Sequence, residues 1–248
     1  MLETRSDDRV RHEAHQGGPT IGAQMLRALR RYPGRTAFSW DGGAMTYAQA
    51  VDLVGRMQRT FAARGLRRQA TIALLTANRA DAWCAGLAAS ASALRVTWLH
   101  PIGSLDDHLE QLEDVEAEAL VVDVASFADR GGEIAARAPS LRTVFTLGTA
   151  AYGIDLSAAA ASAGSASASD FADASDVSVI NYTGGTTGRS KGVLRRHTQS
   201  VAMTNAIRAD FEFPAVPNFL AVAPISHAAG TKIGPVLLRG GTIHLLPK

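Results

Sequence analysis

The chain has 248 residues, of which 46% are hydrophobic and 19% are charged, a balance typical of a globular protein with one large domain or two small ones. A net charge of +2 argues against a nucleic-acid-binding protein, which would carry a dense basic face. No stretch of about eighteen apolar residues occurs, so no membrane span is predicted. The charged N-terminus lacks the apolar core of a signal peptide, and the single cysteine fits a reducing, cytoplasmic compartment.

The first part of the chain predicts a loosely held tail, two helices and a hairpin. Residues 1–18 are charged, and we expect them to be disordered or loosely held. Apolar residues recur at helical spacing over 20–33, where a Pro-Gly pair ends the helix. The turn at 41–43 lies between two short strands and predicts a β-hairpin. A second helix over 47–64 follows, with Gly65 as its C-terminal cap.

A basic run accompanies the end of this second helix. At helical spacing it predicts a solvated face rather than a nucleic-acid site. Its members are Arg56, Arg59, Arg64, Arg67 and Arg68.

Strands and helices then alternate, and the strands are continuously apolar. This pattern predicts an α/β fold with a mostly parallel sheet or sheets layered with helices on both faces. Cys84 lies in an apolar helical stretch and is interpreted as a buried small hydrophobe rather than a nucleophile. The predicted strands cover 70–75, 95–100, 118–123 and 142–148, and the helices cover 79–94, 104–115 with Ser104 as N-cap, and 124–138 with an interruption at Gly131-Gly132.

The segment 157–169 contains only serine, alanine and glycine. It predicts a surface connection of low complexity, part of which its alanines could make helical. Beyond it we expect a strand at 177–182, a helix at 197–210, and strands at 218–224 and 241–247. The chain stops directly after this last apolar strand, so we expect a cut inside a larger protein, because a parallel sheet needs cover on both faces.

The segment 182–193, "YTGGTTGRSKGV", follows the strand at 177–182 and is rich in groups that bind anions. Glycines let successive backbone N–H groups converge on an anion. A buried strand before the loop places it at the carboxyl end of the sheet, where α/β proteins bind ligands. The alternative interpretation is a flexible polar loop. Hydroxyl donors are Thr183, Thr186, Thr187 and Ser190, and positive charges are Arg189 and Lys191.

Two common phosphate motifs do not fit this segment. The pattern G-x-x-x-x-G-K-[ST] fails because Ser190 precedes Lys191 and Gly192 follows it. The pattern G-x-G-x-x-G fails because the loop has no two glycines two residues apart that a third follows at the required spacing. A kinase-type P-loop and a dinucleotide-binding fingerprint are therefore excluded.

The segment resembles the phosphate-binding signature of the adenylate-forming superfamily, which includes acyl-CoA synthetases, firefly luciferase and the adenylation domains of peptide synthetases. The usual form is [YF]-T-S-G-[ST]-T-G-x-P-K-G. Gly184 replaces the usual serine, which removes a hydroxyl donor, and Ser190 replaces the usual proline, which removes a restriction on φ. The matching residues are Tyr182, Thr183, Gly185, Thr186, Thr187, Gly188, Lys191 and Gly192.

Other segments are similar to the family in the expected order. The stretch 45–83 is similar to the opening segment, with a T-Y pair, a helix, a strand and then an asparagine. "VAPISHAAG" is similar to P-x-x-H-x-x-G, with matches at Pro224, His227 and Gly230. The resemblance covers about residues 20–248 and implies that 19–248 is an incomplete part of the large N-terminal adenylation domain. The later family motifs, including the magnesium ligand and the catalytic lysine of the C-terminal domain, are absent.

The resemblance implies a two-step activation of a carboxylic acid, in which ATP gives an acyl-adenylate and coenzyme A then takes the acyl group. It implies Mg²⁺ on the phosphates. Lys191, Thr186 and His227 are the candidate catalytic residues; a hydrogen-bonded structural histidine is the alternative for His227. The nearby His197 is interpreted as structural. The candidate cofactor-binding residues are Thr183, Gly184, Gly185, Thr186, Thr187, Gly188, Ser190 and Lys191.

Several alternatives stay open at this point. The acid could be fatty or aromatic, and the acceptor could be a carrier protein instead of coenzyme A. A non-catalytic nucleotide-binding module is a third possibility, favoured by the departures at Gly184 and Ser190. Arg195 and Arg196 either add positive potential or are exposed. We expect little turnover from residues 1–248 alone, no nucleic-acid partner, and a homodimer as one possible assembly.

Overall fold

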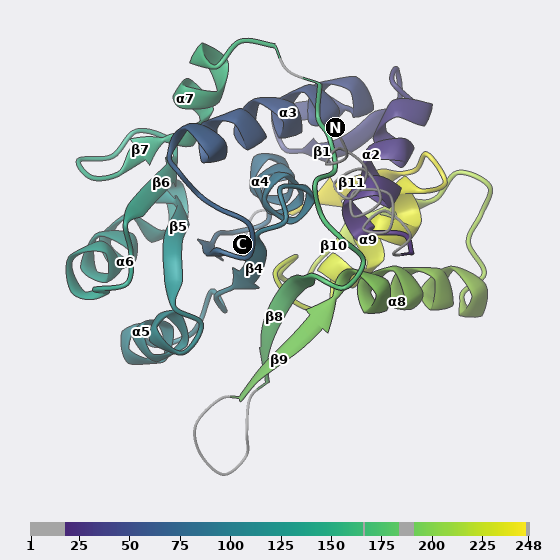
Figure 1. The fold of residues 1–248 in the computed structure, drawn as a ribbon. Helices are drawn as coiled ribbons and strands as arrows, with labels where there is room; N and C mark the ends of the chain where they lie inside the picture. Colours follow the sequence, from purple (N-terminus) through teal and green to yellow (C-terminus); the bar gives the residue numbers. More distant parts are fainter. Residues whose placement is uncertain (1–17, 166, 184–190, 247–248) are drawn as a thin grey trace, which may run out of the picture.

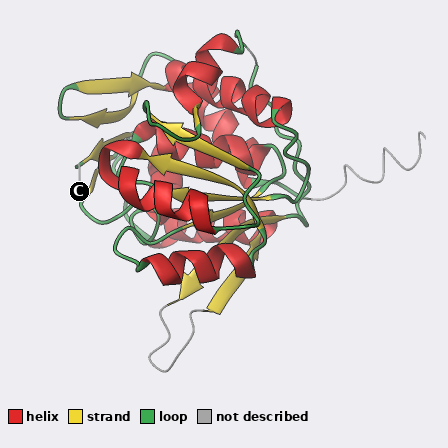
Figure 2. Ribbon diagram, turned by 90° about the vertical axis from the view of Figure 1, so that its left-hand side faces the viewer, coloured by secondary structure: helices red, strands yellow, loops and turns green. Residues whose placement is uncertain are grey.

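The computed structural model describes residues 18–165, 167–183 and 191–246, and within these ranges the chain forms two sheets covered by helices (Figure 1). The strand order is β7-β6-β5-β3-β4-β8-β9 in the larger sheet and β10-β11-β1-β2 in the smaller one. Figure 2 shows the helices enclosing the strands from both sides. The predicted α/β fold, with a mostly parallel sheet or sheets layered with helices, is therefore confirmed, and the sheets are two.

The larger sheet is parallel except at its last strand. Its neighbouring strands β5, β3, β4 and β8 run in one direction, and β9 pairs with β8 antiparallel. Its strands are β3 (Thr71–Leu75), β4 (Arg95–Trp98), β5 (Ala117–Asp123), β6 (Thr143–Leu147), β7 (Ile154–Asp155), β8 (Val177–Thr183) and β9 (Lys191–Arg196).

Helices cover this sheet on both faces because its central strands are apolar on both. Ile72 and Leu74 of β3 join one buried cluster, and Ala73 and Leu75 join another. The first cluster packs under α3 (Tyr47–Ala63), α4 (Ala80–Ala91) and α7 (Leu156–Ser162). The second packs under α5 (Leu105–Asp114) and α6 (Val124–Arg137). Cys84 is fully buried in the first cluster, as its apolar helix predicts.

The smaller sheet joins the two ends of the described chain. The hairpin of β1 (Thr36–Trp40) and β2 (Gly43–Thr46) is antiparallel, as its turn predicts. Phe38 of β1 pairs in parallel with Ile243 of β11 (Thr242–Leu245), which also pairs with β10 (Asn218–Ala221). The helices α2 (Ile21–Arg31), α8 (His197–Asp210) and α9 (Gly230–Leu237) pack against one another between the two sheets.

The helix 124–137 is interrupted at a place that the glycines do not mark. Phe127 has non-helical angles, φ −136° and ψ 28°, whereas the helix runs through Gly131-Gly132. The predicted interruption is therefore wrong. Gly131 leaves room for the Tyr152 ring, since a Cβ there would overlap the Tyr152 hydroxyl. That hydroxyl donates to the Ala128 carbonyl at 2.7 Å.

Three further elements were not expected from the pattern. β7 has two residues, β9 is exposed over most of its length, and α9 contains Pro235. The low-complexity connection is helical in its first half, over Leu156–Ser162. The predicted caps agree with the structure: Ser104 Oγ accepts from Asp107 N at 3.0 Å, and Gly65 follows α3 with φ 75°.

Candidate active site

Strands β8 and β9 bring together the two ends of the glycine-rich loop. Thr183 pairs with Lys191 at the end of this hairpin, and both side chains are exposed. Figure 1 shows the two strands projecting from the rest of the fold. The loop therefore leaves the sheet at the carboxyl end of β8, as the sequence predicts. Six of its predicted binding residues lie outside the described residues: Gly184, Gly185, Thr186, Thr187, Gly188 and Ser190.

Tyr182 anchors this hairpin to the neighbouring helix α5. Its hydroxyl donates to the carboxylate of Asp114 and lies 3.4 Å from the Gln111 carbonyl. Both acceptors belong to the last turn of α5. The tyrosine that begins the sequence motif thus fixes the strand from which the loop departs.

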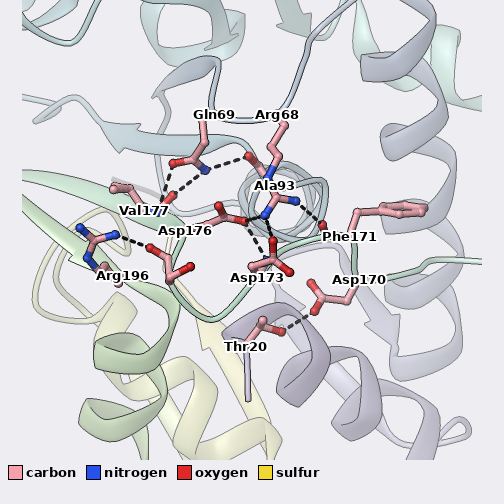
Figure 3. Close-up of polar contacts among 11 residues, drawn as sticks. Thr20, Arg68, Gln69, Ala93, Asp170, Phe171, Asp173, Asp176, Val177 and Arg196 are labelled. Carbon is pink, nitrogen blue, oxygen red and sulfur yellow. Dashed lines mark hydrogen bonds and ion pairs between the residues drawn. The ribbon is translucent and has the colours of Figure 1, made fainter. Parts of the chain in front are cut away.

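The segment 168–177, which we call the strap, fixes the other end of β8 (Figure 3). Arg68 contacts it three times, through the Phe171 carbonyl at 3.0 Å and through the carboxylates of Asp173 and Asp176. Gln69 accepts from the Val177 N–H at 3.2 Å. The strap therefore enters β8 in one register, and the position of the loop follows from that register.

The basic run, predicted as a solvated face, also binds neighbouring segments of the chain through three of its arginines. Its residues are exposed except Arg56. Arg56, Arg59 and Arg68 nevertheless donate to backbone carbonyls at Ala161, Ser165 and Phe171. The contacts of Arg56 and Arg59 hold the low-complexity segment against α3, and Arg68, which follows α3, holds the strap.

His227 lies on a loop near the carboxyl end of β4. Its Nδ1 is 2.8 Å from the Ser226 hydroxyl, and its ring packs edge-on against His100 with 4.3 Å between ring centroids. Burial, with a smaller contribution from the neighbouring His100, lowers the pKa of His227. The imidazole is therefore neutral near pH 7, so it can accept as well as donate a hydrogen bond.

Asn78 holds the loop that carries His227. Its amide donates to the carbonyls of Ala221 and Ala223 at 3.2 and 3.1 Å, and its Oδ1 accepts from Ile225 N at 2.8 Å. Asn78 is itself buried. The sequence offered one signal for this role, an asparagine three residues after the end of a buried strand.

A cavity of about 400 Å³ opens beside His227. This volume is in the range of small-molecule sites. Its walls come from α2, α4, α8, α9 and strands β4, β8 and β9. The apolar part includes Trp83, Leu87, Trp98 and Met203, and the polar part includes Ser178, Asn181, Arg195 and Ser200.

The structure therefore brings some predicted residues together and separates others. His227 and Ala228 line the cavity. Thr183 and Lys191 lie at the tip of the β8–β9 hairpin, which contributes Asn181 and Arg195 to the cavity wall. Sequence reasoning missed the two tryptophans and gave Arg195 no definite role. No polar pattern marks the tryptophans, because apolar residues in a strand and a helix predict packing equally well.

His197 belongs to the interior and not to this cavity. It begins α8 and is fully buried. Neither ring nitrogen has a hydrogen-bond partner among the described residues. Burial lowers its pKa to about 4. These surroundings agree with the structural interpretation of His197.

The described residues contain no group of three or more His, Cys, Asp or Glu side chains suited to hold a metal ion. None of their helices is long and apolar enough to cross a membrane.

Comparisons with known proteins place these features in one family. The family model described as AMP-binding enzyme matches residues 25–248. A medium/long-chain-fatty-acid–CoA ligase of Mycobacterium tuberculosis is 31% identical over 250 residues, which is 98% of this chain and 43% of that protein. A D-alanine–D-alanyl carrier protein ligase of Streptococcus equi is 40% identical over 72 residues, 28% of this chain and 14% of that protein.

A solved structure agrees with this assignment at the level of the fold. The inhibitor-bound N-terminal domain of a second Mycobacterium tuberculosis protein superposes with a TM-score of 0.82 at 22% identity. The superposition covers 92% of this chain and 57% of that one. The chain thus spans less than half the length of the fatty-acid–CoA ligase that it matches.

Proposed function

The chain belongs to the family of AMP-binding enzymes, and we propose that the whole protein activates a carboxylic acid with ATP and then transfers the acyl group to coenzyme A. In the first step the acid carboxylate attacks the α-phosphorus of ATP, which forms an acyl-adenylate and releases pyrophosphate. In the second step the thiol of coenzyme A attacks the acyl carbon and releases AMP.

One observation carries this proposal. The cavity and the glycine-rich loop share the hairpin of β8 and β9: Asn181 lines the cavity, and Thr183, two residues further, begins the loop. A site for an apolar acid therefore lies beside the ends of a loop suited to hold phosphates. Reaction between an acid and ATP needs the two held in contact.

The loop is proposed to hold the β- and γ-phosphates as pyrophosphate leaves. The backbone of Gly184, Gly185 and Gly188 would donate N–H groups, and Thr183, Thr186, Thr187 and Ser190 would donate hydroxyl groups. Lys191 would neutralise charge that develops on the leaving group. Mg²⁺ would accompany the phosphates and neutralise part of their charge.

His227 is proposed to orient the carboxylate of the acid at the cavity. Ser226 and His100 fix its ring, and its lowered pKa keeps it neutral near pH 7. A neutral ring can donate one hydrogen bond to a carboxylate without forming an ion pair that would weaken the nucleophile.

The apolar part of the cavity suits a fatty or aromatic acid. Trp83, Trp98 and Leu87 present apolar surface, and each buried CH₂ group would contribute about 0.8 kcal/mol. The similarity to a medium/long-chain-fatty-acid–CoA ligase supports the same class.

A carrier protein in place of coenzyme A is the second candidate acceptor. The similarity to a D-alanine–D-alanyl carrier protein ligase, which extends over 72 residues, favours a carrier protein as the acceptor. Trapping of the acyl-adenylate with hydroxylamine, without formation of acyl-CoA, would support this acceptor. A non-catalytic nucleotide-binding module is the alternative outcome if no acid is activated.

Exchange of labelled pyrophosphate into ATP tests the first step directly. The full-length protein should catalyse exchange when a fatty or aromatic acid is added. Lys191→Ala should lower the rate about 100-fold to 1000-fold, because one preorganised donor to a developing charge contributes that much. Lys232→Ala is the matched control, since Lys232 lies on α9 and packs over the Phe211 ring. Absence of exchange with every acid of a broad panel would contradict the proposal.

Other expectations remain predictions. We expect residues 1–248 alone to turn over little acid, since the relatives are more than twice as long. We also propose a cytoplasmic location, with a homodimer as one possible assembly.

A further inference from the structure

Arg195 places a positive charge in the wall of the cavity. It lies in β9, lines the cavity together with Ser178 and Ser200, and is only partly exposed. Its neighbour Arg196 is exposed and donates to the Ser175 carbonyl in the strap. The two successive arginines thus face different surroundings, and only Arg195 is a cavity residue.

The guanidinium of Arg195 has no acceptor among the described residues. Its side chain forms no hydrogen bond or ion pair with the described residues. Burial lowers the pKa of Arg195, and no acidic neighbour raises it again. A guanidinium carries five N–H donors. None of the Arg195 nitrogens is among the fully buried side-chain atoms that lack a partner, so these donors are open to the cavity, and an acceptor on a ligand can bind them in place of water.

The backbone of Arg195 is held in place. Its carbonyl accepts a hydrogen bond from the Ser178 hydroxyl at 3.0 Å, and that hydroxyl is 2.9 Å from the Ser200 hydroxyl. Arg195 also pairs with Val179 in the strand ladder. A charged group on such a fixed support loses less entropy when it binds a ligand.

The strand register places Arg195 away from His227. Val96 pairs with Val179, and Val179 pairs with Arg195, so these residues share one level of the sheet. His100, whose ring contacts His227, follows Val96 by four residues. At about 3.3 Å per residue, the two levels are about 13 Å apart along the strands. An acid whose carboxylate lies at His227 would therefore present its remote end toward Arg195.

We propose that Arg195 is a specificity-determining residue that binds an oxygen acceptor, a carboxylate or a carbonyl, at the end of the acid remote from the activated carboxylate. The preferred substrates are then ω-oxo or α,ω-dicarboxylic acids with an apolar middle section. Both kinds offer oxygen lone pairs in the geometry that a guanidinium binds. This proposal rests on the proposed function, because it assigns the substrate class of the same site.

Calorimetric binding to the full-length protein tests the proposal without requiring turnover. The probes are ω-oxo acids, α,ω-dicarboxylic acids and unsubstituted straight-chain acids of matched, graded length. We expect the best oxygen-bearing acid to bind about 10-fold to 100-fold more tightly than its unsubstituted partner, as for a hydrogen bond to a charged group. Arg195→Leu should remove this preference, and Arg196→Leu should keep it.

The outcomes separate this proposal from the proposed function. Equal affinity for substituted and unsubstituted acids, or an unchanged preference in Arg195→Leu, would overturn the role of Arg195. If the oxo acids bind better than the dicarboxylic acids, the acceptor is a carbonyl; the reverse order identifies a carboxylate, and either supports the proposal. A preference that depends on Arg195 without any pyrophosphate exchange would leave the binding role in place and refute the activation step.

Discussion

Two histidines of this chain, His197 and His227, have opposite surroundings in the fold. His197, at the start of α8, is fully buried and has no hydrogen-bond partner among the described residues. His227 lines the cavity, its ring is hydrogen-bonded to the Ser226 hydroxyl, and it contacts the His100 ring. Burial lowers the pKa of both rings. The difference teaches that burial decides which of the two rings a ligand can reach: the His227 ring lies beside an open space and the His197 ring does not.

The interior histidine should make stability depend on pH. The pKa of His197 is about 4 in the folded chain and 6.5 without the fold. Between these values the unfolded chain binds the proton more strongly, so stability is complete above pH 6.5 and falls as the pH drops toward 4. The loss should be about 3 kcal/mol from this residue. Urea unfolding at a series of pH values measures it.

A pair of leucine variants sharpens this comparison. His197→Leu should flatten the dependence between pH 6.5 and 4, because leucine does not titrate. His227→Leu should leave most of the dependence in place, since the cavity ring is partly exposed. Equal flattening by the two variants would show that the two surroundings are not as different as the structure indicates.

A glycine determines the turn that carries the cavity histidine. A Cβ at Gly230 would overlap the Ile225 carbonyl oxygen, so Gly230→Ala forces the backbone to move. We expect a loss of about 2 kcal/mol in unfolding free energy, as for other overpacked sites. Gly34→Ala is the control, because no atom lies within 4 Å of its added Cβ. Similar unfolding midpoints for both variants would contradict this account of the turn.

The strap supports the surroundings of His197 from outside. The His197 N–H donates to the Asp176 carbonyl at 3.0 Å, and the Asp176 carboxylate pairs with Arg68 at 2.6 Å. Arg68→Ala should lower the unfolding free energy by about 1 kcal/mol, because this ion-pair group is partly exposed and screened by water. Arg67→Ala, which removes an exposed arginine one residue earlier, should change it by less. An equal effect of the two variants would show that the strap does not depend on Arg68.

Much of the fold could be predicted from the sequence because local pattern determines it. Apolar runs such as Thr71–Leu75 and caps such as Ser104 act through their own neighbourhood. The kink at Phe127, the helix that contains Pro235 and the exposed strand β9 depend on tertiary contacts instead. Only packing and strand pairing across the fold decide such elements.

The candidate site likewise has a part that local sequence marks and a part that only tertiary contacts form. An anion-binding role could be proposed for the glycine-rich loop from the sequence because its glycines and hydroxyls lie close together in the chain. The cavity could not, because Trp83 and Trp98 join it from different elements and neither has a distinctive sequence neighbourhood. Arg195 and Arg196 could not be told apart either, since only the strand register assigns one to the cavity and the other to the strap.

A crystal structure of the full-length protein with a non-hydrolysable acyl-adenylate analogue, an acyl sulfamate of adenosine, tests the central claim most directly. We expect the acyl chain to occupy the cavity beside Trp83 and Trp98, the sulfamate to lie next to His227, and the remote end of the acid to point toward Arg195. An acyl chain bound outside this cavity, with His227 free of contact, would refute the proposed site.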